Sequence, residues 1–134
     1  MTDFFPKPGG GPKSVLLLED EGALTEVLKV HLEMNSWDVT AVSNGVDGLK
    51  HVMERDFDII VCDMMMEKLA GDMFYTAVER SKPHLCKRFV FMTGYKGDKK
   101  IEDFIRKVNG LMLWKPFEAY ELLDTMKSVL QASR

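Results

Sequence analysis

Hydrophobic and polar positions along the chain form two kinds of segment: short unbroken apolar runs, and longer stretches with apolar residues at helical spacing. The apolar runs predict five strands, at residues 14–19, 37–42, 58–62, 88–92 and 111–114. The helical patterns predict five helices, at residues 22–35, 46–55, 72–80, 98–108 and 118–130. Because strands and helices follow one another in strict alternation, the pattern predicts an α/β fold.

The strands predicted at 58–62 and 88–92 consist almost entirely of apolar residues. Strands of this kind are buried on both faces, which is typical of a parallel sheet covered by helices on both sides. Right-handed crossovers then leave few topologies. We therefore predict a doubly wound five-stranded parallel sheet with the strand order 2-1-3-4-5, the flavodoxin-like arrangement.

Residues 1–13 contain three prolines and three glycines, a composition that disfavours both helix and central strand. We expect a flexible tail at 1–13 and one domain at 14–132. The sequence shows no internal repeat, and no output domain follows residue 134. Three readings stay open: a complete single-domain protein, a shuttle between other proteins, or a piece of a larger protein.

Composition narrows the class of protein further. Apolar residues make up 46% of the 134, which is enough for a hydrophobic core, and the net charge of −3 gives no reason to expect direct binding to nucleic acid. The basic excess at 96–107 is interrupted by acids and predicts a solvated helix face. Cys62 lies in an apolar run and is predicted to be buried. No segment has the length of a membrane span or the pattern of a signal peptide, so we expect a cytoplasmic protein without membrane contact.

Chemically reactive side chains follow four of the five predicted strands: Glu19 and Asp20, then Asp63, Thr93 and Lys115. In sheets of this type ligands bind at the carboxyl ends of the strands. Neighbouring carboxylates repel one another unless a cation joins them, and their oxygens suit Mg²⁺. A carboxylate beside that ion is a candidate nucleophile toward a phosphoryl group, and an ammonium and a hydroxyl can bind the phosphoryl oxygens.

Four short motifs coincide with these strand ends. They are VLLLEDE at 15–21, DIIVCDMMM at 58–66, VFMTGY at 90–95 and WKPF at 114–117. Together they resemble the receiver domain of two-component response regulators, most closely the stand-alone, chemotaxis-regulator-like type. The resemblance extends from about residue 13 to residue 130, nearly the whole chain.

The resemblance implies a role for each site residue. Glu19 and Asp20 correspond to the acidic pair of the metal site. Asp63 corresponds to the phosphoacceptor and is also a metal ligand, and the main-chain carbonyl of Met65 completes the protein's share of the Mg²⁺ coordination. By the same resemblance Thr93 and Lys115 bind the phosphoryl group, and Lys115 precedes a proline that is often cis in such a position.

The implied function is a phosphoacceptor signalling module. A sensor histidine kinase or a phosphotransfer protein supplies the phosphoryl group, and the receiver signals to a downstream protein, here unknown, by changing conformation. The protein is then not an enzyme in the ordinary sense, although it catalyses phosphotransfer and dephosphorylation at its own aspartate. Homodimerisation stays open.

Two positions depart from the family pattern. Glu67 stands where the family usually has a proline, from which we expect a looser loop after the third strand. Met112 stands where the family often has an aromatic residue that acts as a rotamer switch. Trp114 shares the side of the strand on which Met112 lies and is a candidate substitute.

Three alternatives stay open. A haloacid-dehalogenase-type phosphatase places a second aspartate two residues after its nucleophile, where this chain has Met65. A flavodoxin-type flavin carrier needs a phosphate-binding loop after its first strand, where the acidic turn at 19–21 would repel phosphate. A degenerate receiver would only bind partners, but the presence of Asp20 together with the acceptor, the threonine and the lysine disfavours this reading.

Overall fold

The computed structural model describes residues 13–94 and 96–132. Residues 1–12 of the predicted tail lie outside the described residues, whereas Lys13 is the first residue of the first strand. The strands are β1 (Lys13–Leu18), β2 (Trp37–Val42), β3 (Ile59–Asp63), β4 (Phe89–Thr93) and β5 (Leu111–Trp114). The helices are α1 (Gly22–Met34), α2 (Gly45–Glu54), α3 (Gly71–Ser81), α4 (Lys99–Val108) and α5 (Ala119–Ala132), with a short 3₁₀ helix η1 (Pro83–Arg88) before β4.

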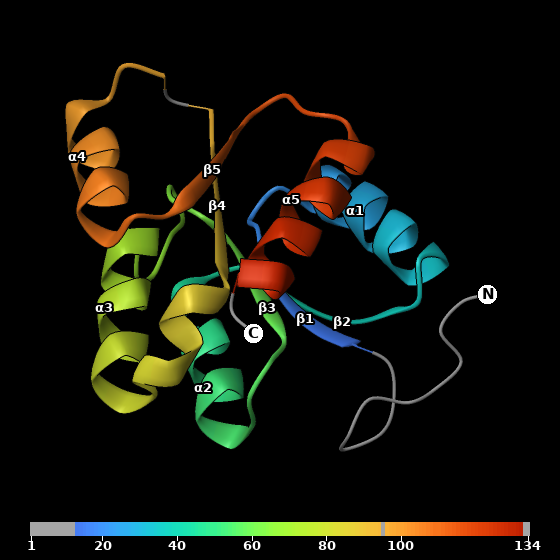
Figure 1. The fold of residues 1–134 in the computed structure, drawn as a ribbon, viewed down its shortest axis with the longest axis horizontal. Coiled ribbons are helices and arrows are strands. Elements are labelled where there is room, and N and C mark those ends of the chain that lie inside the picture. The colour runs from blue at the N-terminus through green and yellow to red at the C-terminus, as the bar shows by residue number, and fades with distance from the viewer. Residues whose placement is uncertain (1–12, 95, 133–134) are drawn as a thin grey trace.

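The strands form one parallel sheet in the order β2-β1-β3-β4-β5, as predicted (Figure 1). The predicted elements are all present, with ends that agree to within one or two residues. The 3₁₀ helix η1 was not predicted. Pro83 marks a helix stop, and the stop signal is the same whether a loop or a 3₁₀ turn follows.

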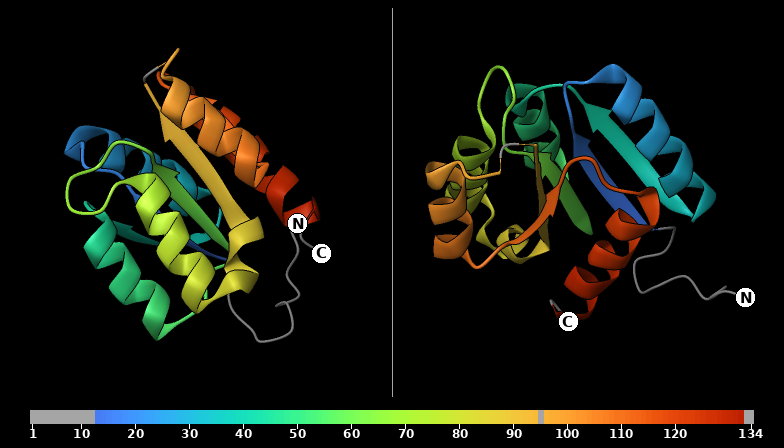
Figure 2. Two further views of the ribbon diagram at one scale, coloured as in Figure 1. Left: turned by 90° about the vertical axis from the view of Figure 1, so that its left-hand side faces the viewer. Right: turned by 90° about the horizontal axis from the view of Figure 1, so that it is seen from above.

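Helices cover both faces of the sheet, α1 and α5 on one and α2, α3 and α4 on the other (Figures 1 and 2). Alternate residues of the central strands enter opposite cores, because successive side chains of a strand point to opposite faces. Leu16 and Leu18 pack in the core with α2, α3 and α4, while Val15 and Leu17 pack in the core with α1 and α5. This two-sided burial explains the unbroken apolar strands of the sequence.

The register of the sheet brings the carboxyl ends of the strands to one edge. Leu18 pairs with Cys62, Asp63 pairs with Met92, and Thr93 pairs with Trp114. Asp63 and Thr93, which end β3 and β4, therefore meet Glu19 and Lys115, which follow β1 and β5, at the same edge of the sheet. This is the arrangement that the sequence predicts for the reactive side chains.

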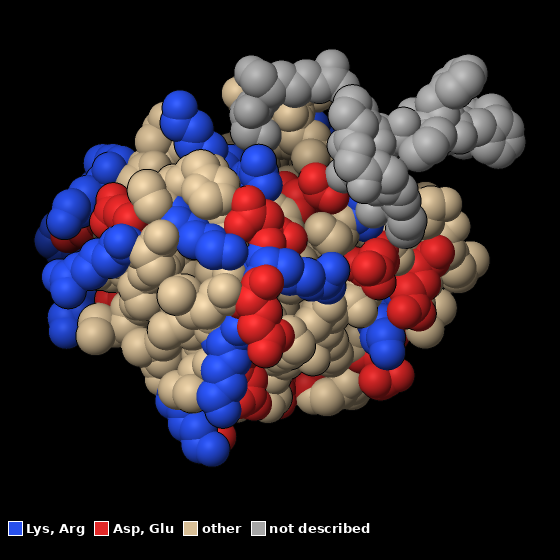
Figure 3. Space-filling view, turned by 90° about the horizontal axis from the view of Figure 1, so that it is seen from below, with Lys and Arg blue, Asp and Glu red and all other residues tan. Residues whose placement is uncertain are grey.

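The surface carries charges of both signs. The exposed face of α4 contains the basic excess noted in the sequence, and Asp103 pairs there with Lys99 at 3.2 Å and with Arg106 at 3.1 Å. Acidic and basic side chains are also interleaved on the face shown in Figure 3. None of the described helices has the length and apolar character that crossing a membrane requires.

Candidate functional site

Asp63 is the last residue of β3 and is only 3% exposed. Both of its carboxylate oxygens accept hydrogen bonds. Met65 donates its main-chain N–H to Oδ1 at 3.0 Å, and Lys115 donates from Nζ to Oδ2 at 2.9 Å. The side chain that the sequence singles out as the acceptor is therefore held in one orientation from two sides.

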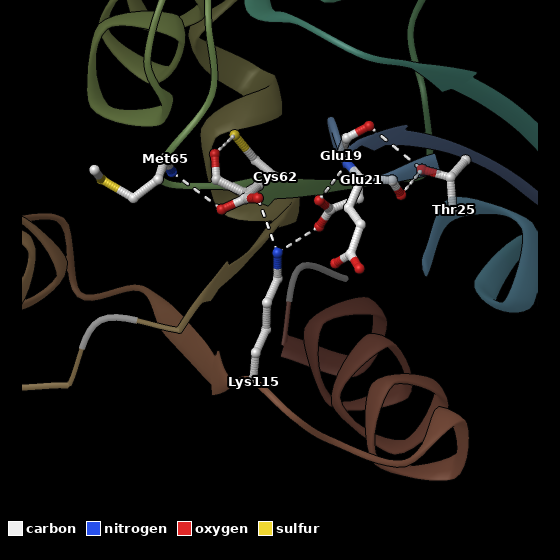
Figure 4. Close-up of polar contacts among 7 residues, drawn as sticks. Glu19, Glu21, Thr25, Cys62, Met65 and Lys115 are labelled. Carbon is white, nitrogen blue, oxygen red and sulfur yellow. Dashed lines mark hydrogen bonds and ion pairs between the residues drawn. The ribbon is translucent and has the colours of Figure 1, made fainter. Parts of the chain in front are cut away.

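Glu19 follows β1 directly and is also buried. Its Oε2 accepts a hydrogen bond from the main-chain N–H of Glu21 at 3.0 Å, and its Oε1 lies 2.6 Å from Nζ of Lys115. Figure 4 shows the Lys115 side chain reaching toward Glu19, and the same ammonium lies 2.9 Å from Oδ2 of Asp63. One ammonium thus joins Glu19 to Asp63 across the sheet.

Within the group of Glu19, Asp63 and Lys115, two carboxylates share one ammonium. Burial raises the pKa of Glu19 despite its contacts with Lys115 and the Glu21 main chain, and the negative charge of Asp63 acts in the same direction. Burial alone would lower the pKa of Lys115, but its contacts with Glu19 and Asp63 outweigh burial and raise it. The carboxylates therefore hold the ammonium in its charged form, while Glu19 remains costly to ionise.

The geometry of the three acids suits a cation. Glu19, Asp20 and Asp63 each offer an oxygen, and these oxygens all lie within 4.8 Å of one another. Glu19 and Asp63 are buried, whereas Asp20 is exposed at the mouth of the site. Among the described residues, Oε1 of Glu19 is the buried side-chain oxygen that accepts no well-aligned hydrogen bond. Hard oxygen donors with excess negative charge are the ligand set that Mg²⁺ prefers.

Thr93 and Lys115 are joined through their main chains. Thr93 is the last residue of β4 and is fully buried. Its carbonyl oxygen accepts a hydrogen bond from the N–H of Lys115 at 2.8 Å. The Lys115–Pro116 peptide bond is cis. The structure therefore gathers Glu19, Asp20, Asp63, Thr93 and Lys115 at the edge of the sheet that the sequence indicates.

The methionines around the acceptor divide into two groups. Met64 and Met66 are buried in the core on the α3 side, and Cys62 is buried there as predicted. Met65 and Met73 are 44% and 58% exposed. The buried pair fills the core, whereas the exposed pair presents thioethers at the surface beside the acceptor.

Met112 and Trp114 share one side of β5, as the alternation of the strand predicts. Both line a small groove of about 240 Å³, whose other wall is formed by Ile101 and Ile105 of α4. Trp114 is also the register partner of Thr93. The groove is therefore connected to the site through the last residues of β4 and β5.

Sequence reasoning missed one support of the acidic turn. The hydroxyl of Thr25 donates to the main-chain carbonyls of Glu19 at 3.3 Å and Glu21 at 3.1 Å (Figure 4). These bonds hold the acid-bearing turn on the first turn of α1. A threonine four residues after the end of an acidic turn gives a weak signal, because threonine is common in helices for other reasons.

A Glu19→Gln variant should be more stable than the parent protein without divalent cations. The folded state raises the pKa of Glu19, so stability is lost as pH rises from the ordinary glutamate value of 4.5 through the raised value. Glutamine removes this loss while Lys115 keeps Asp63 as a partner. Urea unfolding in EDTA should show a gain of about 1 kcal/mol at pH 7.5 that shrinks toward pH 4.5.

Glu26→Gln is the matched control, because Glu26 is an exposed acid on α1. It should change the free energy of unfolding by less than about 0.5 kcal/mol at either pH. A Glu19→Gln variant that is less stable than the parent protein at pH 7.5 would contradict the argument, since the pair with Lys115 would then outweigh the burial of the charge.

The fold and the acidic site define a class of protein, and comparison with known proteins identifies the family. The family model described as "Response regulator receiver domain" matches residues 15–127. The chain belongs to this family. It is a phosphoacceptor signalling module of the two-component type.

Relatives of known description agree with this assignment. The sensor kinase CckA of Brucella abortus (strain 2308) is 28% identical over 124 residues, which cover 90% of this chain and 13% of that protein. The transcriptional regulatory protein SrrA of Staphylococcus aureus (strain NCTC 8325 / PS 47) is 25% identical over 122 residues, which cover 90% of this chain and 48% of that protein. The chain thus spans less than half the length of either relative.

Solved structures show the same fold. A CheY-like receiver domain protein from Methanospirillum hungatei JF-1 has a TM-score of 0.83 at 19% identity, covering 92% of this chain and 97% of that one. The chemotaxis response regulator CheY4 of Vibrio cholerae has a TM-score of 0.80 at 23% identity, covering 89% of this chain and 99% of that one.

Proposed function

We propose that Asp63 is the residue that accepts the phosphoryl group, with Lys115 and Thr93 as its partners. One observation carries the proposal: the buried Asp63 carboxylate lies 2.9 Å from the Lys115 ammonium and within reach of two further carboxylates at the open edge of the sheet. A buried carboxylate between an ammonium and two further acids is a candidate functional group, because the ammonium can bind the negative oxygens of a phosphoryl group and the acids can bind a cation.

In the proposed transfer an oxygen of the Asp63 carboxylate attacks the phosphorus of a phosphohistidine. The new O–P bond forms while the P–N bond breaks, and its electron pair leaves with the imidazole, which takes up a proton. Lys115 then contacts an oxygen of the phosphoryl group in place of the free carboxylate. Later attack by water at phosphorus breaks the O–P bond, releases inorganic phosphate and restores the carboxylate.

Mg²⁺ is the proposed cofactor, and when bound it supplies positive charge that neutralises the phosphoryl oxygens. Glu19, Asp20 and Asp63 would hold it through side-chain oxygens, and Met65 through its main-chain carbonyl. The three carboxylates gathered around the single ammonium of Lys115 leave an excess of negative charge, which supports this ligand set.

The proposed output is a conformational change that starts at Thr93. The hydroxyl of Thr93 moves to bind the phosphoryl group, and the main-chain link to Lys115 passes this shift to β5. Trp114 and Met112 line the groove against α4, so its shape changes with the end of the strand. A two-state change of this kind is a common signalling device.

A sensor histidine kinase or a phosphotransfer protein is the proposed donor, and the receiver acts on a downstream protein. The relatives support this in a general way, because one is a sensor kinase and the other a transcriptional regulatory protein. The domain is proposed to begin with β1 at Lys13 and to extend to residue 132.

Acetyl phosphate tests the function directly, because it can replace the protein donor. With Mg²⁺, intact mass spectrometry should show the addition of one phosphoryl group per chain. Excess EDTA should slow this labelling by more than about tenfold, since the charge of the transferred group is then less well neutralised. Equal labelling with EDTA would reject the metal, and absence of labelling under both conditions would reject the phosphoacceptor role of this chain.

A further inference from the structure

The loop between β3 and α3, residues 64–70, is attached to the first turn of α2. The main-chain N–H groups of Gly45 and Val46 both donate to the carbonyl oxygen of Lys68, at 3.1 and 3.2 Å. The first N–H groups of a helix have no partner within the helix, so this carbonyl satisfies two of them at once. We call this contact the α2 clamp.

The clamped residues have an unusual backbone conformation. Lys68 has φ 48° and Leu69 has φ 81°, both in the left-handed region although neither is glycine. Such a conformation is unfavourable for residues with a side chain, above all for two in succession, and it persists only where the surroundings hold it. The two hydrogen bonds from α2 to Lys68 are such a restraint, in a loop where Glu67 replaces the usual proline.

The contact also requires that α2 come very close to the loop. A Cβ atom added at Gly45 would lie 2.3 Å from the carbonyl oxygen of Leu69 and 2.8 Å from its Cβ. Only glycine allows this approach at position 45. The start of the helix is itself fixed, because the buried Asn44 caps it by accepting a hydrogen bond from the N–H of Asp47 at 2.9 Å.

The same loop carries the main chain next to the acceptor. Its first residue, Met64, donates its N–H to the carbonyl oxygen of Met92 in β4 at 2.8 Å and accepts a hydrogen bond from the N–H of Gly71 at 3.1 Å. Met65 follows and donates its N–H to Oδ1 of Asp63. Because both ends of the loop are fixed, the mobility of the Met65 main chain depends on how firmly α2 holds the other part of the loop, at Lys68.

We propose that the α2 clamp sets the position of the Met65 main chain relative to Asp63, and that Gly45 and Val46 are positioning residues for the acceptor site. Among the described residues neither forms a hydrogen bond with the acceptor or the acids, so they act through the loop. The consequence for Mg²⁺ rests on the proposed function, in which the Met65 carbonyl is a ligand. The consequence for the hydrogen bond between Met65 and Asp63 is independent of the proposed function.

Gly45→Ala tests the clamp, because its methyl group forces the loop away from α2. Gly48→Ala is the matched control: it lies one turn further along the same helix, and its Cβ meets the side chains of Leu18 and Phe74 instead of the loop. Relative to the control, Gly45→Ala should speed hydrogen exchange of the Met65 amide by at least about tenfold. It should also raise the dissociation constant for Mg²⁺, measured by titration calorimetry, by about tenfold.

Val46→Pro is a second variant, which disturbs the clamp at the Lys68 carbonyl and not at Leu69, because the proline ring carbon takes the place of the N–H that donates to Lys68. It removes one of the two donors to Lys68, and proline is tolerated in the first turn of a helix. It should shift both measurements in the same direction but less than Gly45→Ala. Should Gly45→Ala fail to fold, this variant decides alone.

The outcomes separate the two proposals. Equal exchange at Met65 in the clamp variants and in Gly48→Ala would overturn the clamp, whatever happens to Mg²⁺. A parent protein that binds no Mg²⁺ would overturn the metal site, and the exchange measurements would still decide the clamp. Faster exchange at Met65 with unchanged Mg²⁺ affinity would support positioning of Asp63 and remove the Met65 carbonyl from the ligand set.

Discussion

Asp63→Asn should abolish labelling by acetyl phosphate. The asparagine side chain has nearly the same shape, and its amide oxygen can accept the hydrogen bond that Met65 donates at 3.0 Å. What it lacks is the negative charge and the nucleophilic oxygen that form the acyl phosphate. The expected loss is therefore complete, with no phosphorylated species in the intact mass spectrum under conditions that label the parent protein fully.

The fold should survive the substitution. Lys115 keeps Glu19 as an ion partner at 2.6 Å, and removal of one buried carboxylate relieves repulsion with the other acids. Circular dichroism and a melting temperature no lower than that of the parent protein would show this. Loss of labelling can then be assigned to chemistry and not to unfolding.

Asp38→Asn is a suitable control, because Asp38 is an exposed carboxylate on β2, away from the edge where the strands end. It should be labelled at the parental rate. Peptide mapping after borohydride reduction should place the modified residue in the peptide that contains Asp63. Residual labelling of Asp63→Asn at the parental rate would show that another side chain is the acceptor and would remove the main support of the proposed function.

The strand order and the meeting of the reactive side chains were predictable for the same physical reason. Strands buried on both faces are typical of parallel sheets covered by helices, and the carboxyl ends of parallel strands lie at one edge. Asp63 closes an apolar run and Lys115 closes another, so their approach across the sheet follows once the topology is known. The contact of one ammonium with both Glu19 and Asp63 needed the structure, because it depends on side-chain length and orientation.

Other features leave no reliable trace in the sequence. Left-handed backbone is usually marked by glycine or asparagine, and at Lys68 and Leu69 the chain offers neither. The role of Gly45 is equally hidden, because a glycine at the start of a helix has several ordinary explanations. Met64 is buried and Met65 is exposed because of the direction in which the loop leaves β3. The sequence does not reveal this direction, because the alternation of buried and exposed positions stops where the strand ends.

Asp20→Asn should weaken Mg²⁺ binding by at least about tenfold, which is the second large effect we expect. Within the described part of the chain, Lys115 forms ion pairs with Glu19 and Asp63 but not with Asp20. The charges of Glu19 and Asp63 are thus partly neutralised before any metal arrives. Asp20 contributes negative charge that Lys115 does not offset, and its side chain is exposed to solvent.

Magnesium keeps several of its waters, so a carboxylate at the mouth of the site can act directly or through one of them. In either case asparagine retains an oxygen donor but removes the charge that makes the site attractive to a divalent ion. Titration calorimetry with MgCl₂ measures the change in affinity. The rate of labelling by acetyl phosphate at limiting Mg²⁺ should fall in parallel and recover at high Mg²⁺, because the acceptor itself is intact.

Asp47→Asn offers a control within the same groove. Asp47 lines the groove of about 660 Å³ that also contains Glu19 and Asp20, but it belongs to α2 and is not one of the three clustered acids. It removes the same charge from the neighbourhood, so it measures the general electrostatic attraction of the groove. If both variants weaken Mg²⁺ binding equally, Asp20 acts only through long-range electrostatic attraction, and its assignment as a metal ligand is wrong. A loss confined to Asp20→Asn identifies a specific interaction, because the effect of an exposed charge at a distance is screened by salt while that of a ligand is not.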